Sequence, residues 1–418
     1  MITPHATLSL PATAQPVLHW TEEKQARSAL WRSERGAMPP KRVVLADDTL
    51  SADSAYRMAC EGTGLLWRGD FQNARLLLQA LARRIDKPPK ASKTAKMERK
   101  KVLAQAETGV PSGETFHLYR QAKSQRARVL GMVLIEFGAD YAIALRRAPD
   151  AKQACVEAWG HFDGSGPSIA SLRELMGVIS AHEWRKKGVE IPALTSSGAA
   201  VAKAAPNNRI YPHYGVFSPV RGEYVDLVAT APLPKMRPAK FVAFDIGTGT
   251  GVLAAVLALR EVDQVVATDQ DERALACAKE NIYKLRLPNP VKVMQADLFP
   301  EGLASVIVCN PPWLPARPGS PLEGAVYDEG SRMLLGFIKG LAAHLAPGGE
   351  GWLILSDLAE HLGLRTRSEL LAAIAAGGLK VVARMDVKPE HPKALDASNP
   401  LAEARAKEVT SLWRLAAS

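Results

Sequence analysis

Cysteine is scarce in this chain of 418 residues, and no hydrophobic run is long. The four cysteines, Cys60, Cys155, Cys277 and Cys309, lie far apart and form no CxxC pair. Neither a zinc cluster nor a disulfide framework is therefore expected, and a reducing cytoplasm fits these thiols. The longest apolar run, 252–259, is less than half as long as the ~20 residues that cross a bilayer. We expect neither a membrane span nor a bound metal.

The chain also lacks an acidic excess. Its 53 lysines and arginines outnumber 43 aspartates and glutamates, which gives a net charge of +10. With 47% hydrophobic and 23% charged residues, the composition is that of an ordinary globular protein. The start of the sequence has no basic segment that leads into an apolar core, so no signal or transit peptide is expected. The positive charge supports an anionic partner, typically nucleic acid.

A composition break divides the chain between Ile191 and Asn208, where small residues dominate. Such a stretch is typical of a linker, and the length of the chain favours two domains. We predict a helix-rich α+β domain for substrate recognition over 1–190, a linker over 191–208 and a second domain over 209–418. Within the first domain we expect helices over 71–85 and 168–184, and strands over 42–46 and 141–145.

Positive charge gathers in one part of the first predicted domain. Only Asp86, Glu98, Glu107 and Glu114 oppose the basic residues there, which are Arg83, Arg84, Lys87, Lys90, Lys93, Lys96, Arg99, Lys100, Lys101, Arg120, Lys123, Arg126 and Arg128. This segment is either a solvated loop that happens to be basic or a surface that follows a phosphate backbone. The charge of the whole chain favours the phosphate-binding interpretation.

After the linker, strands and helices alternate. We expect strands over 241–247, 264–269, 291–297, 304–310 and 350–357, and helices over 252–262, 271–285 and 330–345. This alternation predicts an α/β fold with a parallel, doubly wound, Rossmann-like sheet. In such sheets the ligand lies beyond the carboxyl ends of the strands. The candidate site residues in the motifs of this chain all lie at the ends of predicted strands or directly after them.

The first of these strands runs into a glycine-rich turn. The turn contains Asp245, Gly247, Thr248, Gly249, Thr250 and Gly251. Glycines let the backbone turn sharply and let a ligand approach closely. The same turn also fits Gly249-x-Gly251-x-x-Ala254, a dinucleotide fingerprint. Asp245 argues against a dinucleotide, because a carboxylate is unfavourable beside a pyrophosphate but suits a cationic amino-acid group. S-adenosylmethionine has such a group and no phosphate, so we predict that these six residues bind it.

Acidic residues follow the next two strands. Asp269 ends the second strand, where its two carboxylate oxygens match the two hydroxyls of a ribose, and Gln270 follows it. Asp297 follows the third strand and can accept from an adenine amino group, while Leu298 or Phe299 contacts the ring. Turns favour aspartate in general, so each residue alone is ambiguous. Three aspartates at successive strand ends, in phase with a glycine turn, favour a cofactor site.

The fourth strand runs into Asn310, Pro311, Pro312 and Trp313. An exocyclic amino or amide nitrogen is a poor nucleophile because its lone pair is delocalised. The Asn310 side-chain oxygen and the Pro311 carbonyl can each accept one N–H, which favours a tetrahedral nitrogen and stabilises its developing charge. The prolines hold these acceptors in place, and Trp313 can stack on a planar group. The alternative is a structural Pro-Pro turn with a buried tryptophan. Asn310 is also expected to contact the cofactor.

These motifs together resemble the class I S-adenosylmethionine-dependent methyltransferases. DIGTGTGVLA, TDQD, QADLF and NPPW are similar in order and spacing to the small-domain group, which includes release-factor glutamine and ribosomal-RNA amino-group methyltransferases. The resemblance covers about half the chain, from Tyr214 on, and implies that Phe217 and Arg221 lie near the pocket. Glutamine-modifying members typically have tyrosine where this chain has Trp313. The segment after Trp313, 314–334, is expected to be a mobile loop over the acceptor, or else a surface insertion.

Three enzymatic functions and one non-enzymatic function remain open, and methylation of a small molecule is the enzymatic one that gives the large basic N-terminal domain no purpose. The favoured one is N-methylation of an exocyclic amino group in RNA, or less readily DNA, with the basic segment holding the polynucleotide. The alternative is methylation of a glutamine amide on a ribosome-associated protein, as the resemblance implies for release-factor enzymes. A non-catalytic adaptor would not need an intact Asn310-to-Trp313 tetrapeptide. Neither a membrane nor a metal is an expected partner.

Overall fold

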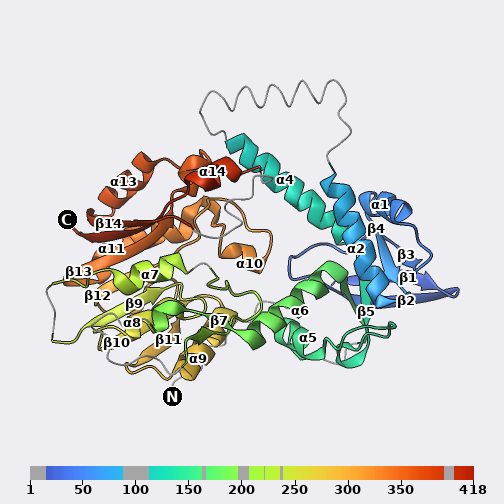
Figure 1. The fold of residues 1–418 in the computed structure, drawn as a ribbon, viewed down its shortest axis with the longest axis horizontal. Coiled ribbons are helices and arrows are strands. Elements are labelled where there is room, and N and C mark those ends of the chain that lie inside the picture. The colour runs from blue at the N-terminus through green and yellow to red at the C-terminus, as the bar shows by residue number, and fades with distance from the viewer. Residues whose placement is uncertain are drawn as a thin grey trace, which may run out of the picture. The chain divides into compact units, whose positions relative to one another are not determined.

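A computed structural model describes residues 16–87, 113–161, 166–195, 207–220, 222–235, 239–389 and 400–418 (Figure 1). Contacts divide the chain into two compact units, one of residues 1–87 with 125–177 and one of residues 88–124 with 178–418. Most of the basic segment (88–112), most of the predicted linker (196–206) and Arg221 lie outside the described residues. The predicted domain limits therefore stay a prediction, although contacts place 113–124 and 178–190 in the second unit.

The first unit is built on a six-stranded mixed sheet in the order β1-β2-β6-β5-β4-β3. Its strands are β1 (Val17–Glu22), β2 (Gln25–Arg32), β3 (Arg42–Ala46), β4 (Thr63–Trp67), β5 (Val133–Phe137) and β6 (Ser168–Ser171). Its helices are α1 (Ala52–Cys60), α2 (Phe71–Asp86), α5 (Lys152–Trp159) and the 3-10 turn η1 (Ala139–Tyr141). Two further helices, α4 (Gly113–Leu130) and α6 (Leu172–Lys187), are each divided between the units.

The helix predicted over 71–85 is confirmed as α2. The Asp70 carboxylate caps it by accepting from the Gln72 amide at 2.8 Å. The strand predicted over 42–46 is confirmed as β3. The strand predicted over 141–145 is wrong, because η1 occupies its start and Tyr141 has a φ of +60°. The helix predicted from residue 168 begins only at Leu172, since the preceding four residues form the buried strand β6.

The second unit contains a seven-stranded sheet in the order β11-β10-β9-β12-β13-β15-β14. Its strands are β9 (Val242–Ile246), β10 (Gln264–Asp269), β11 (Val291–Gln295), β12 (Ala304–Cys309), β13 (Leu345–Ser356), β14 (Leu379–Val387) and β15 (Thr410–Ala417). From β11 to β13 every pairing is parallel, whereas β15 is antiparallel to both neighbours. The order reverses between β9 and β12, so the predicted doubly wound sheet is confirmed, with its switch point there.

Helices and short elements complete the second unit (Figure 1). They are β7 (Val189–Glu190), η2 (Pro192–Leu194), β8 (Arg209–Ile210), α7 (Glu223–Thr230), α8 (Val252–Ala258), α9 (Glu272–Leu285), α10 (Pro321–Gly324), η3 (Glu329–Ser331), α11 (Arg332–His344), α12 (Leu358–His361), α13 (Arg367–Ala376) and α14 (Ala402–Lys407). Strands β7 and β8 pair antiparallel. In the parts of the chain that the structure describes, no helix combines the length and apolarity needed to cross a membrane.

Strand β12 shows how the second sheet separates two hydrophobic cores. Val306 and Val308 pack with α7 and α8, whereas Ile307 and Cys309 pack with α11 and α13. Successive side chains of a strand point to opposite faces, and a sheet covered on both faces therefore needs apolar residues at every position. Every residue of β12 is buried. This packing fixes the end of β12 beside the end of β9.

Candidate active site

The glycine turn between β9 and α8 adopts a backbone that favours glycine. Gly247, Gly249 and Gly251 have φ values of +71°, +54° and +81°. A Cβ on Gly247 would collide with the Met333 Cε atom, and one on Gly251 would lie 3.3 Å from the Ala278 backbone. A Cβ on Gly249 would meet no atom within 4 Å. The turn is therefore packed at both ends and open in the middle.

Asp245 holds this turn against the start of α8. Its side chain is 1% exposed, and its Oδ2 atom accepts from the Thr248 hydroxyl at 2.6 Å and from the Ala254 amide at 2.9 Å. Burial raises the pKa of the Asp245 carboxyl to about 7, although both hydrogen bonds favour its ionised form. The sequence predicts Asp245 as a cofactor ligand. In the structure one of its oxygens accepts hydrogen bonds from the turn and from α8. Its role as a cofactor ligand stays a prediction.

The raised pKa of Asp245 predicts a pH-dependent stability. The native state retains a proton that the unfolded chain loses above its ordinary pKa of 3.8, so the free energy of unfolding should fall between about pH 4 and pH 7. Asp245→Asn keeps a side-chain oxygen for Thr248 and Ala254 but cannot ionise. Denaturant unfolding across this range should show a shallower decline for the variant. An unchanged decline would mean that Asp245 does not titrate there.

Asp269, at the end of β10, lies beside the open part of the turn, and its predicted role as a ribose ligand stays a prediction. Its Oδ2 atom accepts from the Gly249 amide at 3.0 Å, and its Oδ1 atom accepts from the Asp271 amide at 3.0 Å. Burial raises the pKa of Asp269, and these hydrogen bonds oppose that rise. Each carboxylate oxygen has a second lone pair, so the held carboxylate can still accept from two hydroxyls.

Gln270 and Asp297 form a polar cluster at the ends of β10 and β11. The Gln270 side-chain amide donates to Asp297 Oδ1, and Arg332 of α11 lies 3.8 Å from the same oxygen. Arg332 also donates to the Gln270 side-chain oxygen at 3.4 Å. The Asp297 side chain is 71% exposed, so its acceptor atoms face solvent. No sequence motif pointed to Arg332, because it approaches from a helix that follows 35 residues later in the chain.

Leu298 and Phe299 lie against two glycines of α11. A Cβ on Gly336 would come within 2.7 Å of Leu298, and one on Gly340 within 2.6 Å of Phe299. Phe299 stacks on His344 with ring centres 4.3 Å apart. Leu298 has a φ of +70°, which is rare for a residue with a branched side chain. Both side chains are thus part of the packing with α11, and the choice between Leu298 and Phe299 for a contact with adenine stays a prediction.

The Asn310-to-Trp313 segment follows β12 at the same sheet edge as the glycine turn. Cys309 pairs with Ile246, so the residues that follow each strand emerge side by side. The Trp313 indole N–H donates to Asn310 Oδ1 at 2.9 Å. Pro311 is buried, and Trp313 packs against both hydrophobic cores. An amide oxygen has two lone pairs, so the Asn310 oxygen that the indole fixes in place can accept a second N–H.

The segment after Trp313, for which the sequence predicts a mobile loop, forms a loop with internal hydrogen bonds, and its mobility stays a prediction. Leu314 forms a β-bridge with Tyr327, and the Asp328 amide donates to the Leu314 carbonyl at 2.9 Å. The Asp328 carboxylate in turn accepts from the Met333 amide at 2.7 Å. Met333 is the residue whose side chain lies over the glycine turn. The loop thus connects Trp313 to the predicted cofactor site.

A buried asparagine on α9 ties the segment before β9 to the glycine turn. Asn281 accepts from the Tyr211 amide at 2.8 Å and donates to the Thr250 carbonyl at 3.0 Å. Sequence reasoning missed Asn281, although a polar residue on the apolar face of a helix is a signal for such a bond. Phe217, predicted near the pocket, is 37% exposed. Arg221 is not among the described residues, so its predicted role stays open.

The chemistry of these residues fits a ligand with a hydroxylated sugar and a cationic group. The turn is open at Gly249, and the Asp269 carboxylate beside it offers acceptors for a diol. Neither the open turn nor the Asp269 carboxylate supplies the positively charged side chain that a pyrophosphate would need as a partner. Over the described ranges, no three His, Cys, Asp or Glu side chains are grouped so that they could hold a metal ion.

Part of the chain is similar to known proteins. Residues 207–367 match the family model described as the methyltransferase small domain. The tRNA1(Val) (adenine(37)-N6)-methyltransferase of Pedobacter heparinus is 31% identical over 29% of this chain and 57% of its own length. A release factor glutamine methyltransferase of Caulobacter vibrioides is 31% identical over 38% of this chain and 59% of its own length. The chain thus spans less than two thirds of these relatives.

A solved structure of a ribosomal protein L11 methylase from Lactobacillus delbrueckii is also similar. It is 17% identical, covers 50% of this chain and 85% of its own, and has a TM-score of 0.34. The matched family model includes β9 to β13, the glycine turn and the segment from Asn310 to Trp313. Residues 207–367 of the second unit therefore match a methyltransferase small domain, and methyltransferases of this class use S-adenosylmethionine as their cofactor.

Proposed function

We propose that this protein methylates an exocyclic amino nitrogen of a nucleic-acid base, with RNA as the favoured substrate and S-adenosylmethionine as the methyl donor. The observation that carries this proposal is the position of Asn310. Its side-chain oxygen is held by the Trp313 indole at 2.9 Å, at the strand end that adjoins the glycine turn. A fixed acceptor at this point can orient an amino group toward a donor bound at the turn.

The chain's own residues would perform three tasks in this reaction. S-adenosylmethionine, when bound, supplies an electrophilic methyl group. The Gly249 backbone and Asp269 would hold its amino-acid and ribose parts, and Asp297 its adenine amino group. The Asn310 oxygen and the Pro311 carbonyl would accept the two N–H groups of the target, which favours a tetrahedral nitrogen with an available lone pair. Trp313 would stack on the planar base, which must be flipped out if it is paired.

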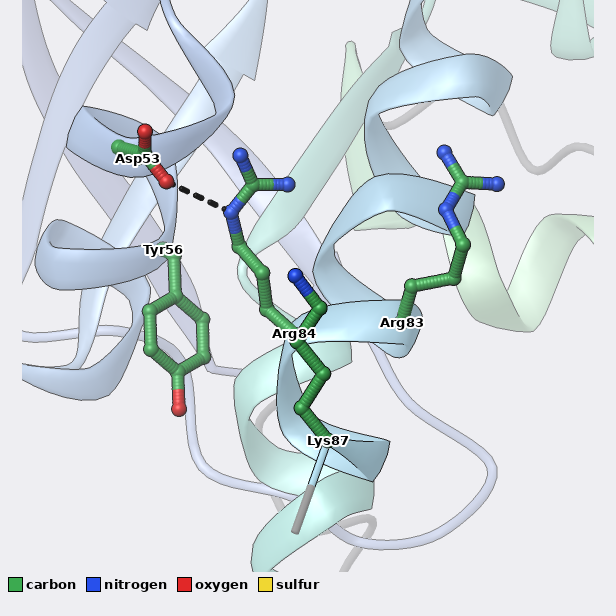
Figure 2. A pocket seen from close by; sticks show the side chains of 5 residues that line it. All are labelled: Asp53, Tyr56, Arg83, Arg84 and Lys87. Atoms are coloured by element: carbon green, nitrogen blue, oxygen red, sulfur yellow. Dashed lines mark hydrogen bonds and ion pairs between the residues drawn. The ribbon is translucent and has the colours of Figure 1, made fainter. Parts of the chain in front are cut away.

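A basic cavity in the first unit supports RNA as the substrate. It measures about 550 Å³ and is lined by Arg83, Arg84 and Lys87 near the end of α2, and by Asp53 and Tyr56 of α1 (Figure 2). Arg84 donates to Asp53 at 2.8 Å, and Asp53 is the sole carboxylate among the described residues that line the cavity. Three cations against one exposed carboxylate suit a phosphate group. The three cationic residues of the cavity are the first residues of the basic segment identified in the sequence.

The alternative is methylation of a glutamine amide on a ribosome-associated protein. The release factor glutamine methyltransferase of Caulobacter vibrioides supports it by name. An amide and an amino group present the same pair of N–H donors, so Asn310 and Pro311 would serve both. RNA is favoured because the tRNA methyltransferase is equally similar and the protein is basic. All four cysteines of the chain are free thiols. Because free thiols are typical of a reducing compartment, this supports a cytoplasmic location for the protein.

Transfer of a labelled methyl group into cell extract separates these functions. Purified protein is incubated with labelled S-adenosylmethionine and extract, and the products are treated with nuclease or with protease. Label that survives protease but not nuclease supports RNA, and the labelled nucleoside then identifies the acceptor atom. Label that survives nuclease but not protease supports the glutamine alternative. The absence of label in every fraction contradicts methyl transfer.

The basic cavity leads to a prediction for RNA binding. The triple variant Arg83→Gln, Arg84→Gln and Lys87→Gln should bind RNA more weakly, because it lacks cations that release counterions from the phosphates. The slope of log K against log salt should become shallower by about 0.7 for each phosphate of single-stranded RNA that the variant no longer neutralises. Fluorescence anisotropy over a salt series measures both quantities.

A matched triple variant controls for the change in net charge. Lys24, Arg27 and Lys41 are exposed residues of the same unit outside the cavity. Their replacement by glutamine removes three charges and should leave the salt slope near that of the wild type. Equal effects of the two variants would mean that the cavity has no special part in RNA binding.

A further inference from the structure

Helix α4 supplies residues to the second unit although it lies far before residues 207–367 in the sequence. Phe116, near its start, is 1% exposed and packs with Leu314, Leu358, Leu362 and Leu401. Leu314 is the residue directly after Trp313. The first half of α4 therefore completes a hydrophobic cluster that adjoins the predicted acceptor site.

Arg120, one turn further along α4, makes three contacts with a single short stretch of chain. Its Nη1 atom lies 3.1 Å from Glu323 Oε2, and its Nη2 atom donates to the Arg317 carbonyl at 2.6 Å. Its guanidinium carbon lies 4.0 Å from the centre of the Tyr327 ring. The Arg120 side chain is 23% exposed, so water screens these contacts only in part.

All three partners belong to the loop of residues 314–331, between Trp313 and α11. Arg120 therefore joins the outgoing and returning halves of this loop, at Arg317 and at Tyr327. The bridge from Tyr327 to Leu314 then fixes the backbone next to Trp313. The amide of Gly319 also donates to Glu323 Oε2 at 2.8 Å, so the same carboxylate links the loop internally and to α4.

We propose that Arg120 is a positioning residue for methyl transfer, which closes the 314–331 loop and so holds Trp313 in place at the acceptor site. This inference rests on the proposed function of that site. Arg120 acts through Tyr327, Leu314 and the backbone, and does not itself touch the acceptor. An error of about 1 Å in the position of a stacking group can cost on the order of a hundredfold in rate.

The contacts of Arg120 require an arginine. A guanidinium is planar, so it can stack on Tyr327 while its N–H groups donate in the plane to Glu323 and to the Arg317 carbonyl. A lysine ammonium is a point charge that can pair with Glu323 but cannot make the other two contacts together. Arg120→Lys should therefore retain part of the stabilisation that Arg120 gives to the 314–331 loop, and Arg120→Ala should retain none of it.

Two measurements on the full chain test this proposal. The first is hydrogen exchange of the 314–331 amides in the free protein, which should become at least tenfold faster in Arg120→Ala. The second is single-turnover methyl transfer at saturating cofactor and acceptor, which should fall about tenfold to a hundredfold in Arg120→Ala and less in Arg120→Lys. The affinity for S-adenosylmethionine should stay within about twofold of the wild type.

Gln121→Ala is the matched control. Gln121 is an exposed residue of the same helix, next to Arg120, and is not one of the basic residues of the basic segment. Its replacement should change neither measurement. Wild-type exchange in Arg120→Ala, or wild-type turnover despite faster exchange, would overturn the proposal. If the wild type itself transfers no methyl group, the proposed function fails, and the exchange measurement still decides whether Arg120 closes the loop.

Discussion

Replacement of Asn310 by alanine is expected to lower the rate of methyl transfer by about 10²- to 10³-fold, a cost typical of removing one preorganised hydrogen-bonding group at a reacting centre. The affinity for S-adenosylmethionine should stay near that of the wild type, because Asn310 supplies only one of the predicted cofactor contacts and Gly249 and Asp269 supply others from other strand ends. Single-turnover kinetics measure the rate, and isothermal titration calorimetry measures the affinity.

The hydrogen bond between Asn310 and Trp313 makes a control necessary. Asn310→Ala removes the proposed acceptor for the target amino group and also the partner of the indole N–H. Trp313→Phe removes the indole N–H and keeps an aromatic ring, so it isolates the second effect. If Asn310 contacts the target, Asn310→Ala should be far slower than Trp313→Phe. Equal losses in the two variants would mean that Asn310 only orients the tryptophan.

The sequence predicted the parts of the site that depend on local structure. The glycine turn, Asp269 and Asn310 each follow a buried strand, and a parallel sheet brings the ends of β9, β10 and β12 to one edge. The residues that sequence reasoning missed reach the site from helices elsewhere in the chain. Met333 and Arg332 approach from α11, and their contacts depend on how that helix packs, which no spacing in the sequence records.

The first unit shows a different limit of sequence reasoning. Strands β4 and β6 are buried at every residue, so they lack the polar alternation that distinguishes a half-buried strand from part of a helix. Strand β6 also runs directly into α6 without a glycine or proline between them, so the pattern of the two together is that of one helix. Its register between β2 and β5 is set by long-range pairing, which a single sequence does not reveal.

Long-range contacts also explain why the start of α4 was predicted as part of the first domain, whereas contacts place residues 113–124 in the second unit. Phe116 and Arg120 lie in a basic stretch, and the sequence offered no reason to separate them from the first predicted domain. Their partners, Leu314 and Tyr327, are about two hundred residues away. A contact of that range depends on tertiary packing, which overrides the local pattern.

Asp269→Ala is expected to weaken S-adenosylmethionine binding by more than tenfold. A hydrogen bond to a charged acceptor contributes about 1.5–3 kcal/mol, and the variant would lose the proposed pair to the ribose hydroxyls. It would also free the Gly249 amide, which Asp269 Oδ2 now holds at 3.0 Å, so the glycine turn should lose order as well. Both losses act on cofactor binding, and calorimetry with the cofactor alone measures their sum.

Asp271→Ala separates the predicted ribose contact from a general loss of stability at this strand end. Asp271 caps α9 by accepting from the Arg273 amide at 2.7 Å, and its replacement should cost about 1 kcal/mol of folding stability. Its backbone amide would remain, so Asp269 should keep its position and the cofactor its affinity. If Asp269→Ala binds the cofactor as tightly as the wild type, or no more weakly than Asp271→Ala, the ribose assignment of Asp269 is wrong. The glycine turn would then have to bind its ligand without a carboxylate from β10.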